Sequence, residues 1–115
     1  VSIEQIMNWN PEAIITSSPQ FYKTVYSDPI WTSVEAVQNK RVYLAPQNPF
    51  CWIDRPQGPH LIIGTAWTAK MLYPDLFADM DLDSLTGEFY SEFFHYALED
   101  SDLDMLLHPE AKITK

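Results

Sequence analysis

Hydrophobic positions recur along this chain with two periods, one typical of helices and one typical of buried strands. Short β-branched runs bounded by turn residues predict strands over residues 13–16 and 41–45. A longer run, apolar over most of its circumference, predicts a helix from about His60 to Tyr73 that is stopped by Pro74. Strands that alternate with helices indicate an α/β layer architecture.

Several helix starts are signalled by polar caps. Ser2 can act as an N-cap and Gln5 can return the bond as a capping box, which predicts a short helix over residues 3–9. A capping residue followed by proline, which favours the first helical position, occurs at positions 18–19 and again at 28–29. These signals predict helices on both sides of the first strand.

The last strong element is an amphipathic helix predicted from about Ser84 to Leu98. Its apolar side chains at helical spacing are Leu85, Phe89, Phe93 and Tyr96. The aromatic side chains of this region can form either a binding patch or part of the core, and they are Phe89, Tyr90, Phe93, Phe94 and Tyr96. The helical spacing favours the core.

The predicted fold is a three-layer α/β/α lobe with a small, mostly parallel, Rossmann-like sheet. Two convincing strands are few for such a sheet, so we expect a lobe truncated on its N-terminal side. The start at Val1, without an initiator Met or an apolar leader, also suggests a fragment of a longer protein. Strand edges left exposed in this way favour self-association of the fragment.

The charge of the chain limits the kinds of partner that it can bind. The chain has 115 residues with 16 acidic and 7 basic side chains, a formal net charge of −9. This charge repels phosphate backbones and anionic lipid, so we expect no nucleic-acid partner and no direct membrane insertion. No stretch is long enough for a membrane-spanning helix.

Metal sites and catalytic motifs find little support. Asp79, Asp81 and Asp83 alternate as in a calcium loop, but Ser84 replaces the turn glycine and Tyr90 replaces the bidentate glutamate. We therefore interpret the aspartates as charges at a helix entry.

The remaining reactive side chains are scattered. His60, His95 and His108 lack metal-ligand spacing and are interpreted as surface or interface residues. Cys51 is interpreted as an inert, partly buried thiol. Without a phosphate loop or nucleophile elbow, we expect no enzymatic activity and no cofactor.

The segment "NPFCWIDRPQG", residues 48–58, is the strongest candidate site because ligands of α/β folds meet the loops after the carboxyl ends of strands. Trp52 offers a stacking surface, Arg55 a planar fork for anionic oxygens, and Asp54 can orient Arg55 or accept from a ligand. Alternatively, Trp52 fills the core while Asp54 and Arg55 form a surface ion pair. The residues alone leave both interpretations open.

A family resemblance extends this picture. The order "VSIEQIMNWNPEAIIT", "SDPIWTSVEAVQNKRVYLAP", "WIDRP" and "GTAWTAKMLYPDLF" resembles the C-terminal lobe of the periplasmic substrate-binding proteins for iron-siderophores, haem and vitamin B12. The "LYPDLF" ending is more similar to the iron-compound branch. The resemblance covers nearly the whole chain and implies that residues 1–115 are one lobe of a two-lobe, periplasmic or lipid-anchored receptor of an ABC importer.

The resemblance also implies roles for single residues. Trp52 and Arg55, with Asp54 beside them, would form one wall of a cleft for a ferric siderophore or haem, and Glu4 would dock to arginines of the permease. The alternative function is a sensor or protein-interaction module built on the same lobe.

Overall fold

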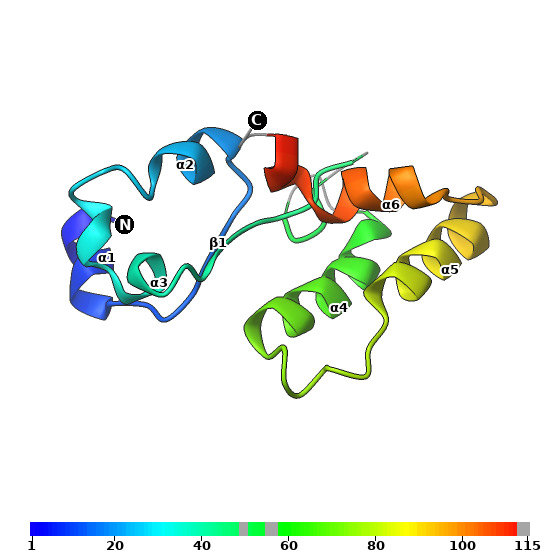
Figure 1. Cartoon of the computed structure of the whole chain (residues 1–115), viewed down its shortest axis with the longest axis horizontal. Coiled ribbons are helices and arrows are strands. Elements are labelled where there is room, and N and C mark those ends of the chain that lie inside the picture. Colours follow the sequence, from blue (N-terminus) through cyan, green and yellow to red (C-terminus); the bar gives the residue numbers. More distant parts are fainter. Residues whose placement is uncertain (49–50, 55–57, 113–115) are drawn as a thin grey trace. The chain divides into compact units, whose positions relative to one another are not determined.

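Figure 1 shows the chain as a computed structural model, which describes residues 1–48, 51–54 and 58–112. The chain divides into two compact units. Unit 1 comprises Val1–Leu44 with Glu110–Lys115, and unit 2 comprises Ala45–Pro109. The expectation that residues 1–115 form one lobe of a larger protein stays a prediction.

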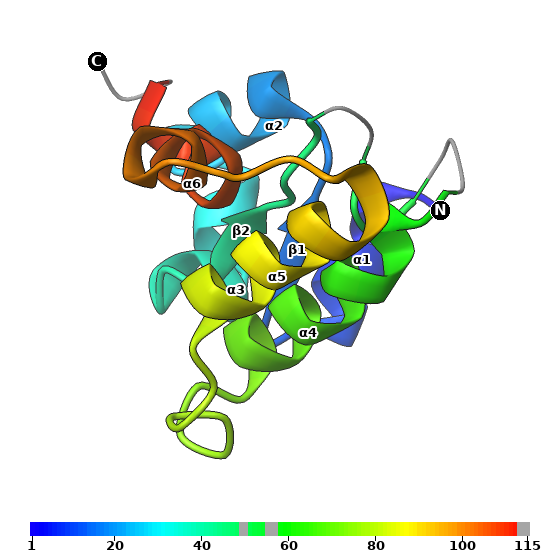
Figure 2. The same ribbon diagram turned by 90° about the vertical axis from the view of Figure 1, so that its right-hand side faces the viewer.

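Unit 1 contains a small parallel sheet. Strands β1 (Ile14–Thr16) and β2 (Val42–Leu44) are connected through α2 (Pro19–Thr24), the 3-10 helix η1 (Trp31–Ser33) and α3 (Glu35–Gln38). The paired residues are Ile14 and Val42, Ile15 and Tyr43, and Thr16 and Leu44. Helix α2 contacts both strands, and the two strands lie side by side in Figure 2. The predicted strands and the α/β class with a small parallel sheet are confirmed, whereas the number of layers stays a prediction.

The buried cluster of unit 1 is aliphatic. It consists of Val25, Val34, Ala36, Val37 and Val42. Ile14, Phe21, Tyr22 and Trp31 pack against it while partly exposed. Phe21 and Trp31 meet edge to face with their ring centroids 4.9 Å apart, a favoured aromatic geometry. Burial of these apolar groups holds the sheet and its crossover together.

Helix α1 (Ile3–Trp9) begins with the predicted capping box. The Gln5 backbone N–H donates to Ser2 Oγ at 3.3 Å, and the Ser2 N–H donates to Gln5 Oε1 at 2.9 Å. The helix ends at Asn10, which has a left-handed φ of 43°. Asn10 Oδ1 also accepts from the Glu35 N–H at 2.9 Å, so this side chain ties the end of α1 to the start of α3.

The two predicted cap-and-proline starts have different outcomes. Ser18 Oγ accepts from the Phe21 N–H at 3.2 Å and caps α2, as expected. Asp28 Oδ1 accepts from the Ile30 N–H at 3.0 Å, but the turn it begins leads only to η1, before the short α3. A cap and a proline can start a turn without specifying how far the helix continues.

The secondary-structure elements of unit 2, in its described residues, are helices. Helices α4 (His60–Leu72) and α5 (Leu82–Phe94) pack together, and α5 also contacts α6 (Asp100–Leu107). Since His60 stacks on Phe94 and Lys70 Nζ donates to the Met80 carbonyl just before α5, helices α4 and α5 run antiparallel. A 3-10 helix, η2 (Pro109–Lys112), follows α6.

Helix α5 differs from its prediction in its length and in the face that it buries. It ends at Phe94, because His95 adopts a left-handed φ of 51°. Its buried residues are Leu82, Thr86, Phe89 and Tyr90. Of the five aromatic residues expected in the core, three are exposed, namely Phe93 at 51%, Phe94 at 42% and Tyr96 at 54%. The core assignment is therefore right for Phe89 and Tyr90 and wrong for these three.

The start of α5 explains one of the acidic residues. Asp81 is its N-cap and accepts from the Ser84 N–H at 3.1 Å and the Ser84 hydroxyl at 2.8 Å. These two bonds hold the pKa of the Asp81 carboxyl below its usual value, and the bond from the Ser84 hydroxyl has the larger effect. Asp83 follows in the first turn, where a negative charge is favourable. The interpretation as helix-entry charges is confirmed for these two aspartates.

Candidate ligand-binding segment and its surroundings

The predicted site residues of segment 48–58 differ in their placement. Arg55 lies outside the described residues. Asp54 is exposed, whereas Trp52 is buried, with an exposed fraction of 0%. At this exposure the indole offers a ligand almost no area for stacking. Stacking by Trp52 stays a prediction that this position does not favour, and the core position we had weighed against it is the one observed.

Two hydrogen bonds fix Trp52 in its position. Its backbone N–H donates to the Pro46 carbonyl at 3.0 Å, and its indole Nε1–H donates to the Asn48 carbonyl at 3.2 Å. The indole N–H is thus satisfied locally, as a buried indole requires. Both acceptors follow β2 directly in the sequence, so these bonds hold Trp52 against the first residues after that strand.

The centre of unit 2 is an aromatic cluster around His60. The imidazole stacks on Phe94 with centroids 5.2 Å apart and meets Phe89 and Tyr90 edge to face at 5.4 and 5.5 Å. Its ring centroid lies 6.2 Å from that of Trp52. His60 is 1% exposed, so its assignment to the surface was wrong. The signal that could have indicated burial is the place of His60 at the start of a helix that is apolar over most of its circumference.

His60 and Tyr90 link α4 and α5 to the candidate segment. His60 Nε2 lies 3.1 Å from Tyr90 Oη, and the Tyr90 hydroxyl donates to the Asn48 carbonyl at 2.9 Å. Burial raises the pKa of Tyr90 to about 12 and lowers the pKa of His60 below its usual value. Sequence reasoning missed this link, because no local motif marks contacts between positions 30 and 42 apart.

Close approach of α4 to the candidate segment depends on Gly64. A Cβ atom at this position would lie 1.8 Å from the Trp52 carbonyl oxygen and 2.7 Å from its carbon. Both are far inside van der Waals contact, so only glycine allows the helix and the segment to pack this tightly. Gly64 is therefore a structural requirement of the candidate site.

A hollow of about 390 Å³ lies along α4 next to Trp52. Its lining residues are Trp52, Ile53, Leu61, Gly64, Thr65, Thr68 and Ala69. The hydroxyls of Thr65 and Thr68 donate to carbonyls of their own helix, each at 2.8 Å. Their oxygens can still accept, so the hollow offers an apolar wall with a few hydrogen-bond acceptors.

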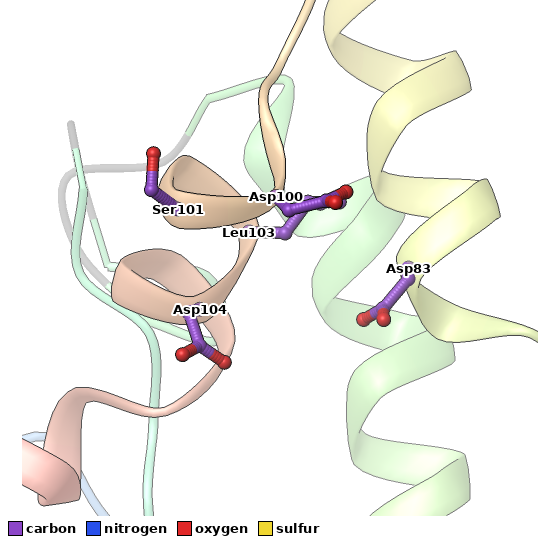
Figure 3. A pocket seen from close by; sticks show the side chains of 5 residues that line it. All are labelled: Asp83, Asp100, Ser101, Leu103 and Asp104. Carbon is purple, nitrogen blue, oxygen red and sulfur yellow. The ribbon is translucent and has the colours of Figure 1, made fainter.

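A second hollow, of about 350 Å³, is acidic. Figure 3 shows the residues that line it on α5 and α6, which are Asp83, Asp100, Ser101, Leu103 and Asp104. Within residues 1–48, 51–54 and 58–112, no group of three or more His, Cys, Asp or Glu side chains is placed to hold a metal ion. Asp100 and Asp102 instead occupy the first turn of α6, where their charges favour the helix.

Charge is divided unequally between the units. Unit 1 has five acidic and five basic residues, whereas unit 2 has eleven acidic and two basic residues, Arg55 and Lys70. The whole formal net charge of −9 therefore belongs to unit 2. An anionic ligand would need a specific cation there, and Lys70 already donates to the Met80 carbonyl.

Glu4, the predicted docking residue, is exposed in the first turn of α1. Helix α1 buries none of its residues, and Trp9 at its end is 65% exposed. The carboxylate is favoured by its position near the helix N-terminus and is accessible to a partner. Docking itself stays a prediction.

Comparison with known proteins shows which proteins this chain resembles. Residues 1–49 match the family described as periplasmic binding protein. A solute-binding protein of an ABC transporter from Sulfurospirillum deleyianum has a TM-score of 0.85 and 42% sequence identity, over 92% of this chain and 32% of that structure. These likenesses confirm, at the level of the family, the resemblance to periplasmic solute-binding proteins.

Two further likenesses are to a molybdate-binding protein. The molybdate-binding protein MolA of Haemophilus influenzae is 33% identical over 96 residues, which are 82% of this chain and 27% of that protein. The structure of the molybdate periplasmic binding protein MolA of Haemophilus influenzae, bound to molybdate, has a TM-score of 0.70 and 30% identity, over 86% of this chain and 31% of that structure. This chain thus spans about a third or less of the proteins it resembles.

The comparisons qualify two expectations. They give no support for the iron-compound branch that "LYPDLF" suggested. The proteins they name are binding components of transport systems rather than enzymes. In the described part of the chain, no helix has both the length and the apolar character needed to cross a membrane.

Proposed function

We propose that this chain is part of the substrate-binding component of an ABC importer, and that the protein captures a small oxyanion of the molybdate type outside the cytoplasm. The observation that carries the proposal is the 33% identity to a molybdate-binding protein over 82% of the chain. A match of that extent in a chain of 115 residues includes its middle, and so includes the candidate segment 48–58.

The chemistry of the segment supports an anionic ligand. A guanidinium presents a planar fork of donors that suits oxyanions, and Arg55 is one of only two basic residues in a unit with eleven acidic ones. Because the surrounding charge repels anions, affinity depends strongly on Arg55. In this proposal the protein delivers its ligand to a permease, with Glu4 as the docking carboxylate.

A ferric siderophore or haem is the alternative ligand, favoured by the "LYPDLF" ending of the resemblance. Both ligand classes present anionic oxygens to an arginine, so the same residue serves either one. The two are separated by direct titration. Neither proposal includes a catalytic step or a resident cofactor.

The test is calorimetric titration of the intact protein with sodium molybdate, a ferric hydroxamate chelate and haem. We expect saturable binding of molybdate, and we expect Arg55→Ala to weaken it by about 1.5–3 kcal/mol, the usual contribution of a hydrogen bond to a charged group. Glu4→Ala is the matched control, since it changes a charge outside the segment, and its affinity should equal that of the wild type.

Other outcomes redirect the proposal. Binding of the ferric chelate or haem alone would replace the ligand class and keep the importer function. Binding of none of the three compounds would favour the sensor or interaction module. Equal molybdate affinity in wild type and Arg55→Ala would remove Arg55 from the site.

A further inference from the structure

The described residues contain one hydrogen-bonded path that joins the helices of unit 2 to the candidate segment. It runs from His60 on α4 to Tyr90 on α5 and on to the backbone carbonyl of Asn48. His60 is 1% and Tyr90 8% exposed, so both side chains lie where a polar group must be paired. The path is thus part of the core and at the same time touches the segment.

The direction of the hydrogen bonds follows from the last acceptor. A backbone carbonyl can only accept, so the Tyr90 hydroxyl proton lies toward Asn48. Tyr90 Oη can then only accept from His60, which places a proton on His60 Nε2. The lowered pKa of His60 keeps the imidazole neutral at neutral pH, and the raised pKa of Tyr90 keeps its hydroxyl protonated.

The Asn48 carbonyl receives two donors. The Tyr90 hydroxyl lies at 2.9 Å and the Trp52 indole nitrogen at 3.2 Å. One donor comes from the segment itself, and the other comes from a helix 42 positions later in the chain. The carbonyl therefore joins the segment to helix α5 through a hydrogen bond.

We propose that Tyr90, oriented by His60, is a positioning residue for the ligand segment, which it holds through the Asn48 carbonyl and the Trp52 indole. The inference rests on the proposed function, because it takes segment 48–58 as the part that meets the ligand. Trp52 then serves binding from within the core, by fixing the described part of the segment that ends at Asp54. Tyr90 itself need not touch the ligand.

The experiment compares Tyr90→Phe with the wild type in the intact protein. The substitution removes one oxygen and keeps the ring, so the aromatic cluster stays filled. Tyr96→Phe is the matched control, because Tyr96 is 54% exposed and lies outside this path. Affinity is measured by calorimetry with sodium molybdate, and the Trp52 indole N–H is followed by NMR after ¹⁵N-tryptophan labelling, with Trp52→Phe to assign its resonance.

We expect Tyr90→Phe to weaken molybdate binding by about 3- to 10-fold, as the loss of one buried hydrogen bond implies. The Trp52 indole resonance should shift, since its acceptor loses a second donor. Tyr96→Phe should change neither quantity. His60→Leu should reproduce the loss of affinity, whereas His60→Gln, whose side-chain N–H can still donate to Tyr90, should restore most of it.

A merely structural role for Tyr90 would lower the melting temperature and leave the affinity unchanged. Unchanged molybdate affinity in Tyr90→Phe, with a wild type that binds, overturns the inference and leaves the proposed function intact. A wild type that binds no molybdate overturns the proposed ligand instead. In that case the inference is tested by the Trp52 indole resonance alone. A shift of this resonance in Tyr90→Phe supports the positioning of the segment by Tyr90, and an unshifted resonance overturns it.

Discussion

The two units solve the packing problem in different ways. The buried cluster of unit 1 is built from valines and an alanine, which pack without any polar group to satisfy. Unit 2 buries Trp52, His60 and Tyr90, and each of these needs a hydrogen-bond partner in a fixed direction. Aliphatic packing depends mainly on volume and shape, whereas the aromatic cluster also fixes orientation. The unit with directional packing is the one that contains the candidate segment.

The largest expected effect tests how tightly unit 2 is packed. Gly64→Ala introduces a Cβ 1.8 Å from the Trp52 carbonyl oxygen, so either α4 or the segment must move. We expect the free energy of unfolding to fall by about 2–3 kcal/mol, as in other overpacked cores. Urea denaturation measures it.

The control for this change is Gly87→Ala in α5. A Cβ at Gly87 would have no neighbouring heavy atom within 4 Å. Alanine also has the better helix propensity, so we expect a gain of about 0.5–1 kcal/mol. Equal effects at the two glycines would contradict the close contact between α4 and the segment.

An intermediate effect is expected in unit 1, where the directional contact lies at the surface. Asn10→Ala removes the acceptor of the Glu35 N–H and leaves a residue with a Cβ in a left-handed conformation. We expect a loss of about 1–2 kcal/mol, from the lost cap and the less favourable backbone. Thermal or urea unfolding measures it.

Asn10→Gly separates the two causes. Glycine adopts the left-handed conformation freely but supplies no side-chain acceptor. Its loss of stability should therefore be smaller than that of Asn10→Ala. A stability equal to that of the wild type in both variants would show that the link between α1 and α3 contributes nothing.

The smallest expected effect is a pH dependence that belongs to unit 2. Because burial lowers the pKa of His60, the unfolded chain takes up a proton at a higher pH than the folded one. The contribution of neutral His60 to stability is then complete above its unfolded pKa of about 6.5 and is lost as the pH falls below it. Among the described aromatic neighbours, Phe89, Tyr90, Phe94 and Trp52, only Tyr90 titrates, far above this range.

Urea midpoints at pH 7.5 and 5.5 measure this effect. The wild type should lose stability between the two values. His60→Gln has no imidazole to protonate, and its loss should be smaller by the share that His60 contributes. An identical loss in both proteins would assign the pH dependence to the carboxylates instead.

Local signals in the sequence predicted most of the elements. The capping box of Ser2 and Gln5 and the N-cap Ser18 are present as expected, and both strands lie within one residue of their predicted bounds. These features depend on neighbours in the chain, which is why the sequence reveals them. Helix α6 was missed because its four acidic or polar residues among eight hide the spacing of Leu103, Leu106 and Leu107.

Contacts between distant positions were not predictable in the same way. The burial of His60, and the burial of the face of α5 that contains Thr86 and Tyr90, depend on which side of each helix packs against a neighbouring element. The Thr86 hydroxyl donates to the Leu82 carbonyl at 2.7 Å. Because this bond satisfies its donor, a polar residue can occupy a core position. For the candidate site, the sequence indicated the segment but not the core position of Trp52 or its fastening by Tyr90.

The parallel pairing of β1 and β2 has a consequence for folding kinetics. Ile14 and Val42 are 28 positions apart, and the crossover between them must be closed before their ladder can form. Helices α4 and α5 also meet through distant positions, since His60 and Phe94 are 34 residues apart. The topology therefore gives neither unit a head start from local contacts, and during synthesis β1 stays unpaired until β2 has been made.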